Sequence, residues 1–171
     1  YNNIGFDTFT SKEFMNFDTT ETGWAKDEVL LEHIKDCLDS TDQQDFVFTV
    51  SDQGHGSYPE ERIIEHPHLM AGGLESEEKN CQWEYYVNQV YEMDQFAADL
   101  VDMMDKRGEP AVVVFYGDHL PTMGLTEADM KSGSLFNTNY VIWDNIGLQK
   151  EDGTIPSYQL MSVVMDRIGL H

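Results

Sequence analysis

Two side chains of metal-ligand type follow directly after a long apolar run. Residues 111–116 are Ala-Val-Val-Val-Phe-Tyr, and Gly117 then leads into Asp118 and His119. A Val-rich run of this kind predicts a parallel strand that is buried on both faces. Ligands of open α/β sheets bind beyond the carboxyl ends of the strands, so both side chains are expected where such folds do chemistry. A carboxylate oxygen beside an imidazole nitrogen suits Mn²⁺ or Zn²⁺.

His55 is the third candidate, and it follows another apolar run at residues 46–50. Glycines on both sides of it leave room beside the ring. An imidazole in that position can hold a phosphate or sulfate oxygen. If both strands end at one edge of the sheet, His55, Asp118 and His119 contribute to the same site.

Each of these assignments has a plainer alternative. Asp118 can cap a turn beside a structural histidine, and His55 can be an ordinary loop residue. His66 and His68, separated by one proline, form a weaker candidate pair because no acidic ligand accompanies them. The residues by themselves leave these alternatives open.

Composition limits the classes of function. The chain has 171 residues and a formal net charge of -22, with 32 acidic side chains against 10 basic ones. This balance excludes nucleic acid as an expected partner, because nucleic-acid binding needs basic patches that replace counterions. No apolar run approaches the length of a membrane span, and no signal peptide is visible. The chain begins without Met inside an apparent structural element, so we expect it to be a piece of a longer protein.

The hydrophobic pattern predicts an alternating order of elements. In the long helix we expect a buried apolar face made by Tyr86, Val90, Met93, Ala97, Leu100 and Met104. Residues 60–80 show weak periodicity and are expected to form a long loop. The sequence does not decide whether Cys37 and Cys81 form a disulfide. The fold class expected is α/β, a layered sandwich with a mostly parallel sheet, with helices at about 26–38, 82–106 and 158–168 and strands at 46–50, 111–116 and 139–143.

Residues 115–121, Phe-Tyr-Gly-Asp-His-Leu-Pro, resemble the second metal motif of the lipoteichoic acid synthase group. That group belongs to the sulfatase branch of the alkaline phosphatase superfamily. Further segments resemble the same group in the same order and cover most of the chain, namely 4–9, 23–28, 49–58, the long helix and 139–145. Gly54 stands where the group commonly has Asn, and Ser57 where it has Pro, so the substrate stays open.

The resemblance implies an alkaline phosphatase/sulfatase-like fold, of which residues 1–171 are the C-terminal portion of the catalytic domain. The nucleophile would lie upstream, so no catalytic residue is assigned in this chain and the fragment is expected to be inactive alone. Asp118 and His119 would be metal ligands, and His55 would bind substrate. The cofactor implied is a divalent metal, Mn²⁺ first, with Zn²⁺, Mg²⁺ and Ca²⁺ as alternatives.

The implied activity is that of a phosphoglycerol transferase-like or sulfatase-like enzyme, with a phosphoglycerol- or sulfate-bearing lipid or glycan as substrate. Two alternatives remain. The enzyme could be a sulfuric ester hydrolase or phosphodiesterase that uses water as acceptor, or the chain could be a non-catalytic surface binding domain of the same fold. The resemblance places the parent protein at the extracytoplasmic face of a bacterial cell membrane, anchored by upstream transmembrane helices.

Overall fold

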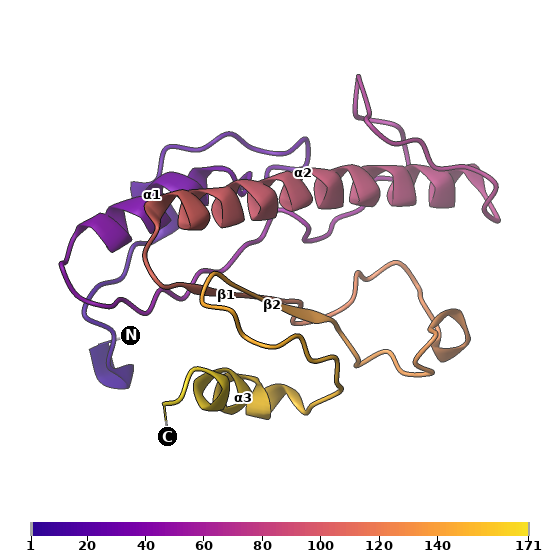
Figure 1. Ribbon diagram of the computed structural model, residues 1–171. Coiled ribbons are helices and arrows are strands. Elements are labelled where there is room, and N and C mark those ends of the chain that lie inside the picture. The colour runs from indigo at the N-terminus through magenta and orange to yellow at the C-terminus, as the bar shows by residue number, and fades with distance from the viewer. Residues whose placement is uncertain (1, 171) are drawn as a thin grey trace. The chain divides into compact units, whose positions relative to one another are not determined.

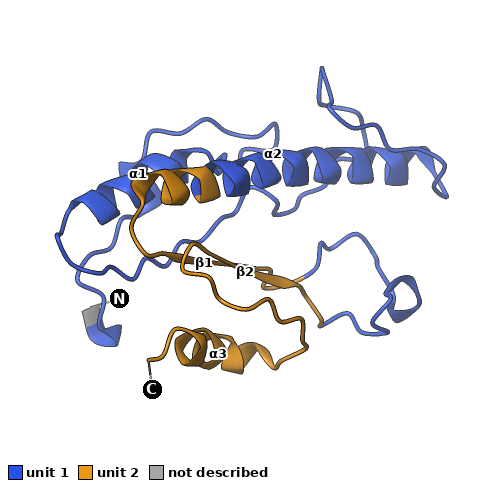
Figure 2. Ribbon diagram, in the orientation of Figure 1, with its two compact units in different colours: residues 1–100, 120–136 blue, residues 101–119, 137–171 orange. Residues whose placement is uncertain are grey.

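The computed structural model describes residues 2–170 and divides the chain into two compact units. The first unit comprises residues 1–100 and 120–136, and the second comprises residues 101–119 and 137–171 (Figure 2). Figure 1 shows the helices and strands, which are α1 Val29–Asp39, α2 Glu77–Arg107, β1 Val112–Tyr116, β2 Tyr140–Asp144 and α3 Leu160–Arg167. Four short 3₁₀ helices are also described, namely η1 Asn2–Ile4, η2 Lys12–Phe14, η3 Glu127–Asp129 and η4 Ser157–Gln159.

Helix α1 confirms the predicted helix at 26–38. Leu30 and Ile34 are buried, as their four-residue spacing requires. The helix starts where the Leu30 amide donates to the Asp27 carbonyl at 2.9 Å. It ends at Ser40, whose backbone N–H and hydroxyl both donate to the Cys37 carbonyl.

Helix α2 is one long helix, as predicted, but it begins earlier than residue 82 and buries a different face. Of the expected apolar stripe only Leu100 is buried, and Val90 is 40% exposed. The buried side chains are largely polar, because irregular backbone packs on this face and needs hydrogen-bond partners. They are Asn80, Cys81, Glu84, Tyr85, Asn88, Gln89 and Leu100.

The predicted long loop at 60–80 is confirmed for residues 60–76, whereas residues 77–80 already belong to α2. Residues 41–76 contain no helix or strand. The buried Asn88 side chain fixes this loop: its oxygen accepts the amides of His68 and Leu69 at 2.7 and 3.0 Å. Its nitrogen donates to the Leu69 carbonyl at 2.7 Å. One turn further back on the helix, Glu84 accepts the Ala71 amide and the Arg62 guanidinium. The loop is therefore irregular but anchored.

Strands β1 and β2 confirm the predicted strands at 111–116 and 139–143. They pair with each other, with Val112 opposite Asp144 and Tyr116 opposite Tyr140. The pairing is antiparallel, so the expected parallel direction is wrong for this pair. The predicted burial on both faces is also wrong, since no residue of Val112–Tyr116 is buried and Tyr116 is 51% exposed. An apolar run does not fix strand direction, which depends on how the connecting chain returns. Asn145 extends the ladder, because its side-chain oxygen accepts the Ala111 amide at 2.8 Å.

The predicted strand at 46–50 is wrong in this structure. Phe46, Phe48 and Val50 are 56%, 49% and 71% exposed. The Phe6 ring lies near both phenylalanine rings, with centroids 5.9 and 6.5 Å away. Among residues 2–170 no strand pairs with this segment. Without a neighbour, an apolar extended segment has neither ladder hydrogen bonds nor cover for its side chains.

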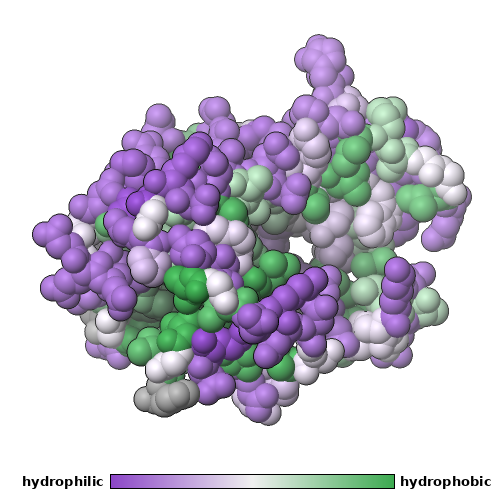
Figure 3. All heavy atoms as spheres, viewed as in Figure 1, coloured by the Kyte–Doolittle hydropathy of each residue, from purple (hydrophilic) through white to green (hydrophobic). Residues whose placement is uncertain are grey.

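Helix α3 confirms the last predicted helix and buries Val164. On the face drawn in Figure 3, hydrophilic residues predominate and exposed apolar residues form separate groups. Over the residues described, no helix combines the length and apolar character needed to cross a bilayer. Both cysteines are free thiols here, and burial raises the pKa of the Cys81 thiol.

Asn88→Ala should lower the free energy of unfolding by about 2–3 kcal/mol, because it leaves buried backbone groups without partners. Chemical denaturation measures this loss, and hydrogen exchange should show faster exchange of the His68 and Leu69 amides. The exposed Asn137→Ala serves as the control and should change neither quantity. Unaltered protection of those two amides in Asn88→Ala would contradict the anchoring role.

Candidate functional site

Asp118 and His119 follow the C-terminal end of β1, as predicted. The side chains are 82% and 53% exposed, and Asp118 Oδ1 lies 3.7 Å from His119 Nε2. Gly117 continues the ladder by donating its amide to the Asn139 carbonyl at 3.1 Å. The strand pair thus presents both side chains to solvent at a defined position.

The donor set fits a divalent metal. Two donors that each bind one ion at about 2.1 Å can be at most about 4.2 Å apart, so the observed separation allows a shared ion. A carboxylate and an imidazole are accepted by Mn²⁺ and Zn²⁺ alike. Within residues 2–170, no group of three or more His, Cys, Asp or Glu converges on one point. The role of Asp118 and His119 as metal ligands stays a prediction.

His55 lies exposed in the loop after residue 50, packed on Trp24 with ring centroids 4.7 Å apart. The Gly56 carbonyl lies 3.1 Å from His55 Nδ1 and accepts the Trp24 indole N–H at 2.9 Å. When Nδ1 carries the proton and donates to this carbonyl, Nε2 presents its lone pair outward. Trp24 and the Gly56 carbonyl therefore orient the imidazole, whereas an ordinary loop histidine would need no such contacts.

Lys12 adds a positive charge to this arrangement, which sequence reasoning missed. Its ammonium lies 5.9 Å from the centroid of the Trp24 ring and 3.5 Å from Asp52 Oδ2. A cation over an indole ring is held by the ring's electron-rich face. The only sequence signal was its scarcity, as one of ten basic residues. Lys12, Trp24 and His55 together offer a cation, an aromatic ring and an imidazole.

Gln53 fixes the loop that carries His55 and was also missed from the sequence. It is 1% exposed, and its oxygen accepts the Asp27 amide at 2.8 Å. Its nitrogen donates to Gln89 Oε1 at 3.1 Å and to Glu92 Oε2 at 2.5 Å. A buried amide with this many partners ties the loop both to the start of α1 and to α2.

The buried carboxyl of Asp27 lies where the His55 loop meets the start of α1. Burial raises its pKa, although the Ser51 hydroxyl and the Gln53 backbone N–H both donate to the carboxylate. The Ser51 hydrogen bond measures 2.6 Å. A charged group is thus held in a poorly solvated position directly beneath the His55 loop.

The weaker histidine pair separates in the structure. The His68 ring stacks on Tyr91 with centroids 4.5 Å apart, whereas His66 is 91% exposed and lies beside Glu65. The two rings therefore have different surroundings and do not form one site.

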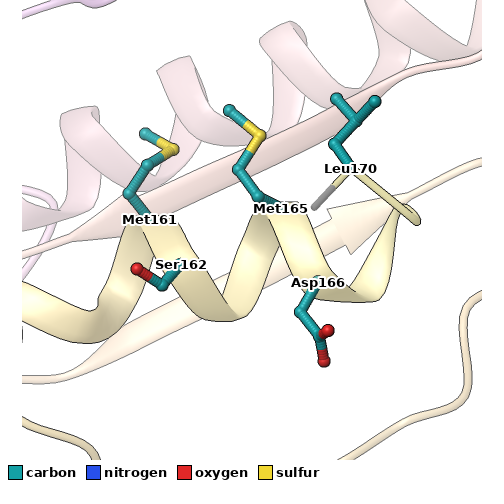
Figure 4. Close-up of a pocket in the computed structure, with 5 residues that line it drawn as sticks. All are labelled: Met161, Ser162, Met165, Asp166 and Leu170. Atoms are coloured by element: carbon teal, nitrogen blue, oxygen red, sulfur yellow. The ribbon is translucent and has the colours of Figure 1, made fainter.

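A cavity of about 660 Å³ lies against α3 in the second unit. Met161, Met165 and Leu170 project to the same side of the helix, whereas Asp166 points away (Figure 4). This lining is mostly apolar and carries no metal-ligand pair.

The structure places His55 in the first unit and the Asp118–His119 pair in the second. His55, Asp118 and His119 are all exposed and lie in loops. A strand, β1, precedes Asp118 and His119, whereas the segment before His55 forms no strand. The meeting of all three residues at one site stays a prediction.

Comparison with known proteins identifies the family of the chain. The sequence matches the profile of the family described as Sulfatase over residues 1–170. It is also 30% identical over 183 positions to a protein of Rhizobium meliloti (strain 1021), provisionally described as a cyclic beta-1,2-glucan modification protein. The alignment covers 94% of this chain but 28% of that relative, so the chain spans less than a third of its length. No solved structure gives a significant match.

The buried Asp27 carboxyl predicts a distinct pH dependence of the free energy of unfolding. Because the pKa of Asp27 is raised in the folded state, the folded protein holds this proton more tightly than the unfolded chain does. Stability from this group is therefore present at low pH and is lost as the pH rises from about 4 through the raised pKa. Asp27→Asn should remove that decline.

Chemical denaturation between about pH 3 and pH 7 measures the effect as the difference in unfolding free energy between Asp27→Asn and the wild type. This difference should shift in favour of the variant as the pH rises. The exposed Asp42→Asn is the control. A constant difference across the range for Asp27→Asn would show that burial does not penalise the Asp27 charge.

Proposed function

The chain belongs to the sulfatase family, and from this premise we propose that it forms part of a metal-dependent enzyme that transfers a phosphoglycerol-type group to a cell-surface glycan. The observation that carries the proposal is the exposed Asp118–His119 pair at the end of β1. The family implies an alkaline phosphatase-like α/β fold. The lipoteichoic acid synthase-like subgroup is part of the proposal and rests on the motif at 115–121.

In this proposal Asp118 and His119 hold a divalent ion, Mn²⁺ first. When bound, such an ion supplies a Lewis acid that stabilises negative charge on an ester oxygen. The nucleophile is provided by a part of the protein outside residues 1–171. The residues of this chain bind and orient the ester, so the chain by itself is expected to be inactive.

His55 and Lys12 suit the anionic end of the substrate. A net charge of -22 repels phosphate and sulfate esters, so a binding site needs local positive charge. Lys12 supplies this charge beside Trp24, and the outward Nε2 of His55 can exchange a proton with a substrate oxygen. Trp24 gives the uncharged part of the substrate an aromatic surface.

Transfer to a glycan is favoured over hydrolysis by one observation. The Rhizobium relative is named for modification of cyclic beta-1,2-glucan. In this proposal a sugar is the acceptor in place of water. A sulfatase-family enzyme that uses water remains the second candidate. As part of the same proposal, the protein acts at the extracytoplasmic face of a bacterial membrane, where such glycans are decorated, anchored by helices outside this chain.

Asp118→Ala and His119→Ala should each weaken Mn²⁺ binding by the complete protein at least tenfold. The loss of residues that merely orient metal ligands already costs about 10–100-fold. Calorimetric titration with Mn²⁺ measures the affinity directly, and activity on a phosphoglycerol ester should fall in parallel.

The chain offers a matched control for this pair. Glu65 and His66 are also adjacent and exposed, with 3.9 Å between Oε1 and Nε2. Glu65→Ala and His66→Ala should leave Mn²⁺ affinity unchanged. Equal affinity in His119→Ala and the wild type would overturn the ligand assignment and with it the proposed enzyme.

Lys12→Ala should raise KM for an anionic ester about fivefold with little change in kcat, because the ammonium attracts the anion without taking part in bond breaking. Steady-state kinetics of the complete enzyme at low salt measures the split. Lys35→Ala is the control, since Lys35 is 57% exposed against 56% for Lys12. If KM rose equally in both variants, the Lys12 effect would come only from the lower positive charge of the protein, and the assignment of Lys12 to the binding site would be wrong.

A further inference from the structure

A second cavity, of about 240 Å³, lies in the first unit and is lined by residues just before α1, by the loop before α2 and by α2 itself. It is smaller than the pockets of about 300–1,000 Å³ that hold drug-sized ligands, so it suits a small group or a short piece of a polymer. Its lining consists of Lys26, Glu28, Gln53, His68, Tyr91, Glu92, Gln95, Phe96 and Asp99.

The aromatic part of this lining is held in place. His68 and Tyr91 stack with an interplanar angle of 26°, and the His68 amide is bound by the buried Asn88. Tyr91 is still 37% exposed, and the half-buried Phe96 adds a further apolar surface. An aromatic wall fixed by backbone hydrogen bonds loses little freedom when a ligand packs against it.

The polar part of the lining divides into occupied and available groups. Glu92 is occupied, since its oxygens accept the Lys26 ammonium at 2.9 Å and the Gln53 amide. Gln95 and Asp99, by contrast, make no side-chain hydrogen bond to any residue within the range 2–170. An amide and a carboxylate offer several donor and acceptor positions in fixed planes.

The charge of the lining selects against anions. Glu28, Glu92 and Asp99 outnumber Lys26, so phosphate and sulfate groups are repelled. A metal ion is disfavoured as well, because in the described part of the chain no three acidic, histidine or cysteine side chains converge. A neutral ligand rich in hydroxyl groups remains, with C–H faces that pack on aromatic rings.

We infer that this cavity binds a neutral sugar unit of a glycan, through hydrogen bonds to Gln95 and Asp99 and packing on Phe96 and Tyr91. Gln53 lines the cavity and lies two residues before His55, so one anchored loop carries both groups. Sugar binding stands on the cavity alone. The further role of this sugar as the acceptor rests on the proposed function.

Titration with a neutral gluco-oligosaccharide of three to five units, followed by saturation-transfer NMR and calorimetry, tests the inference on the purified protein. The wild type should bind the sugar, and Gln95→Ala and Asp99→Ala should each weaken it about tenfold. The exposed Asp94→Ala on the same helix is the matched control and should bind like the wild type. Circular dichroism confirms that each variant is folded.

His55→Ala in the complete enzyme separates this inference from the proposed function, because it should impair ester turnover while sugar affinity stays unchanged. Retained turnover together with no sugar binding by the wild type would overturn the cavity assignment alone. Sugar binding that is lost in His55→Ala and kept in Asp99→Ala would place the sugar elsewhere and overturn it too. The cavity assignment would also be overturned if Mn²⁺ or a quaternary amine, and not the sugar, bound in a way that depends on Asp99.

Discussion

The buried side-chain amide of Gln53 is the constraint on which the candidate site depends. It is 1% exposed and satisfies its hydrogen bonds with Asp27, Gln89 and Glu92, which belong to two different stretches of chain. A buried amide that lost one of these partners would carry the full desolvation penalty of the unpaired group. The loop with His55 therefore stays against α2 although it has no regular structure.

The same principle explains the polar face of α2. Loops expose backbone amides and carbonyls, and when a loop is packed down, these groups need partners from the surface beneath. Asn88 and Glu84 supply them for His68, Leu69 and Ala71, and Glu84 also accepts the Arg62 guanidinium. A helix that supports functional loops thus buries amides and carboxylates where a helix in an ordinary core would bury leucines.

Charge divides the first unit into two kinds of surface. The Lys12 ammonium lies near the Trp24 ring, on which His55 packs, and 3.5 Å from Asp52 Oδ2. The Lys26 ammonium is paired with Glu92 in a cavity of net negative charge. An enzyme that joins an anionic donor to a neutral acceptor needs this kind of separation, because each surface then rejects the other substrate.

The sequence by itself determined the local elements and the family of this protein. The helices, the strands β1 and β2 and the loop before α2 follow from hydrophobic spacing within windows of a few residues. The position of Asp118 and His119 after β1 follows from the same pattern, together with the motif at 115–121. These features depend on neighbours in the chain, and a local pattern is enough to encode them.

Only the tertiary structure decided which surfaces are covered. The antiparallel direction of β1 and β2, the exposure of residues 46–50 and the polar buried face of α2 all depend on segments far away in the sequence. Gln53 and Lys12 carried no pattern of their own, because a single polar residue gains its role from the atoms that fold around it. Hydrogen-bond partners and burial arise only when distant segments meet, and this is why spacing alone could not reveal them.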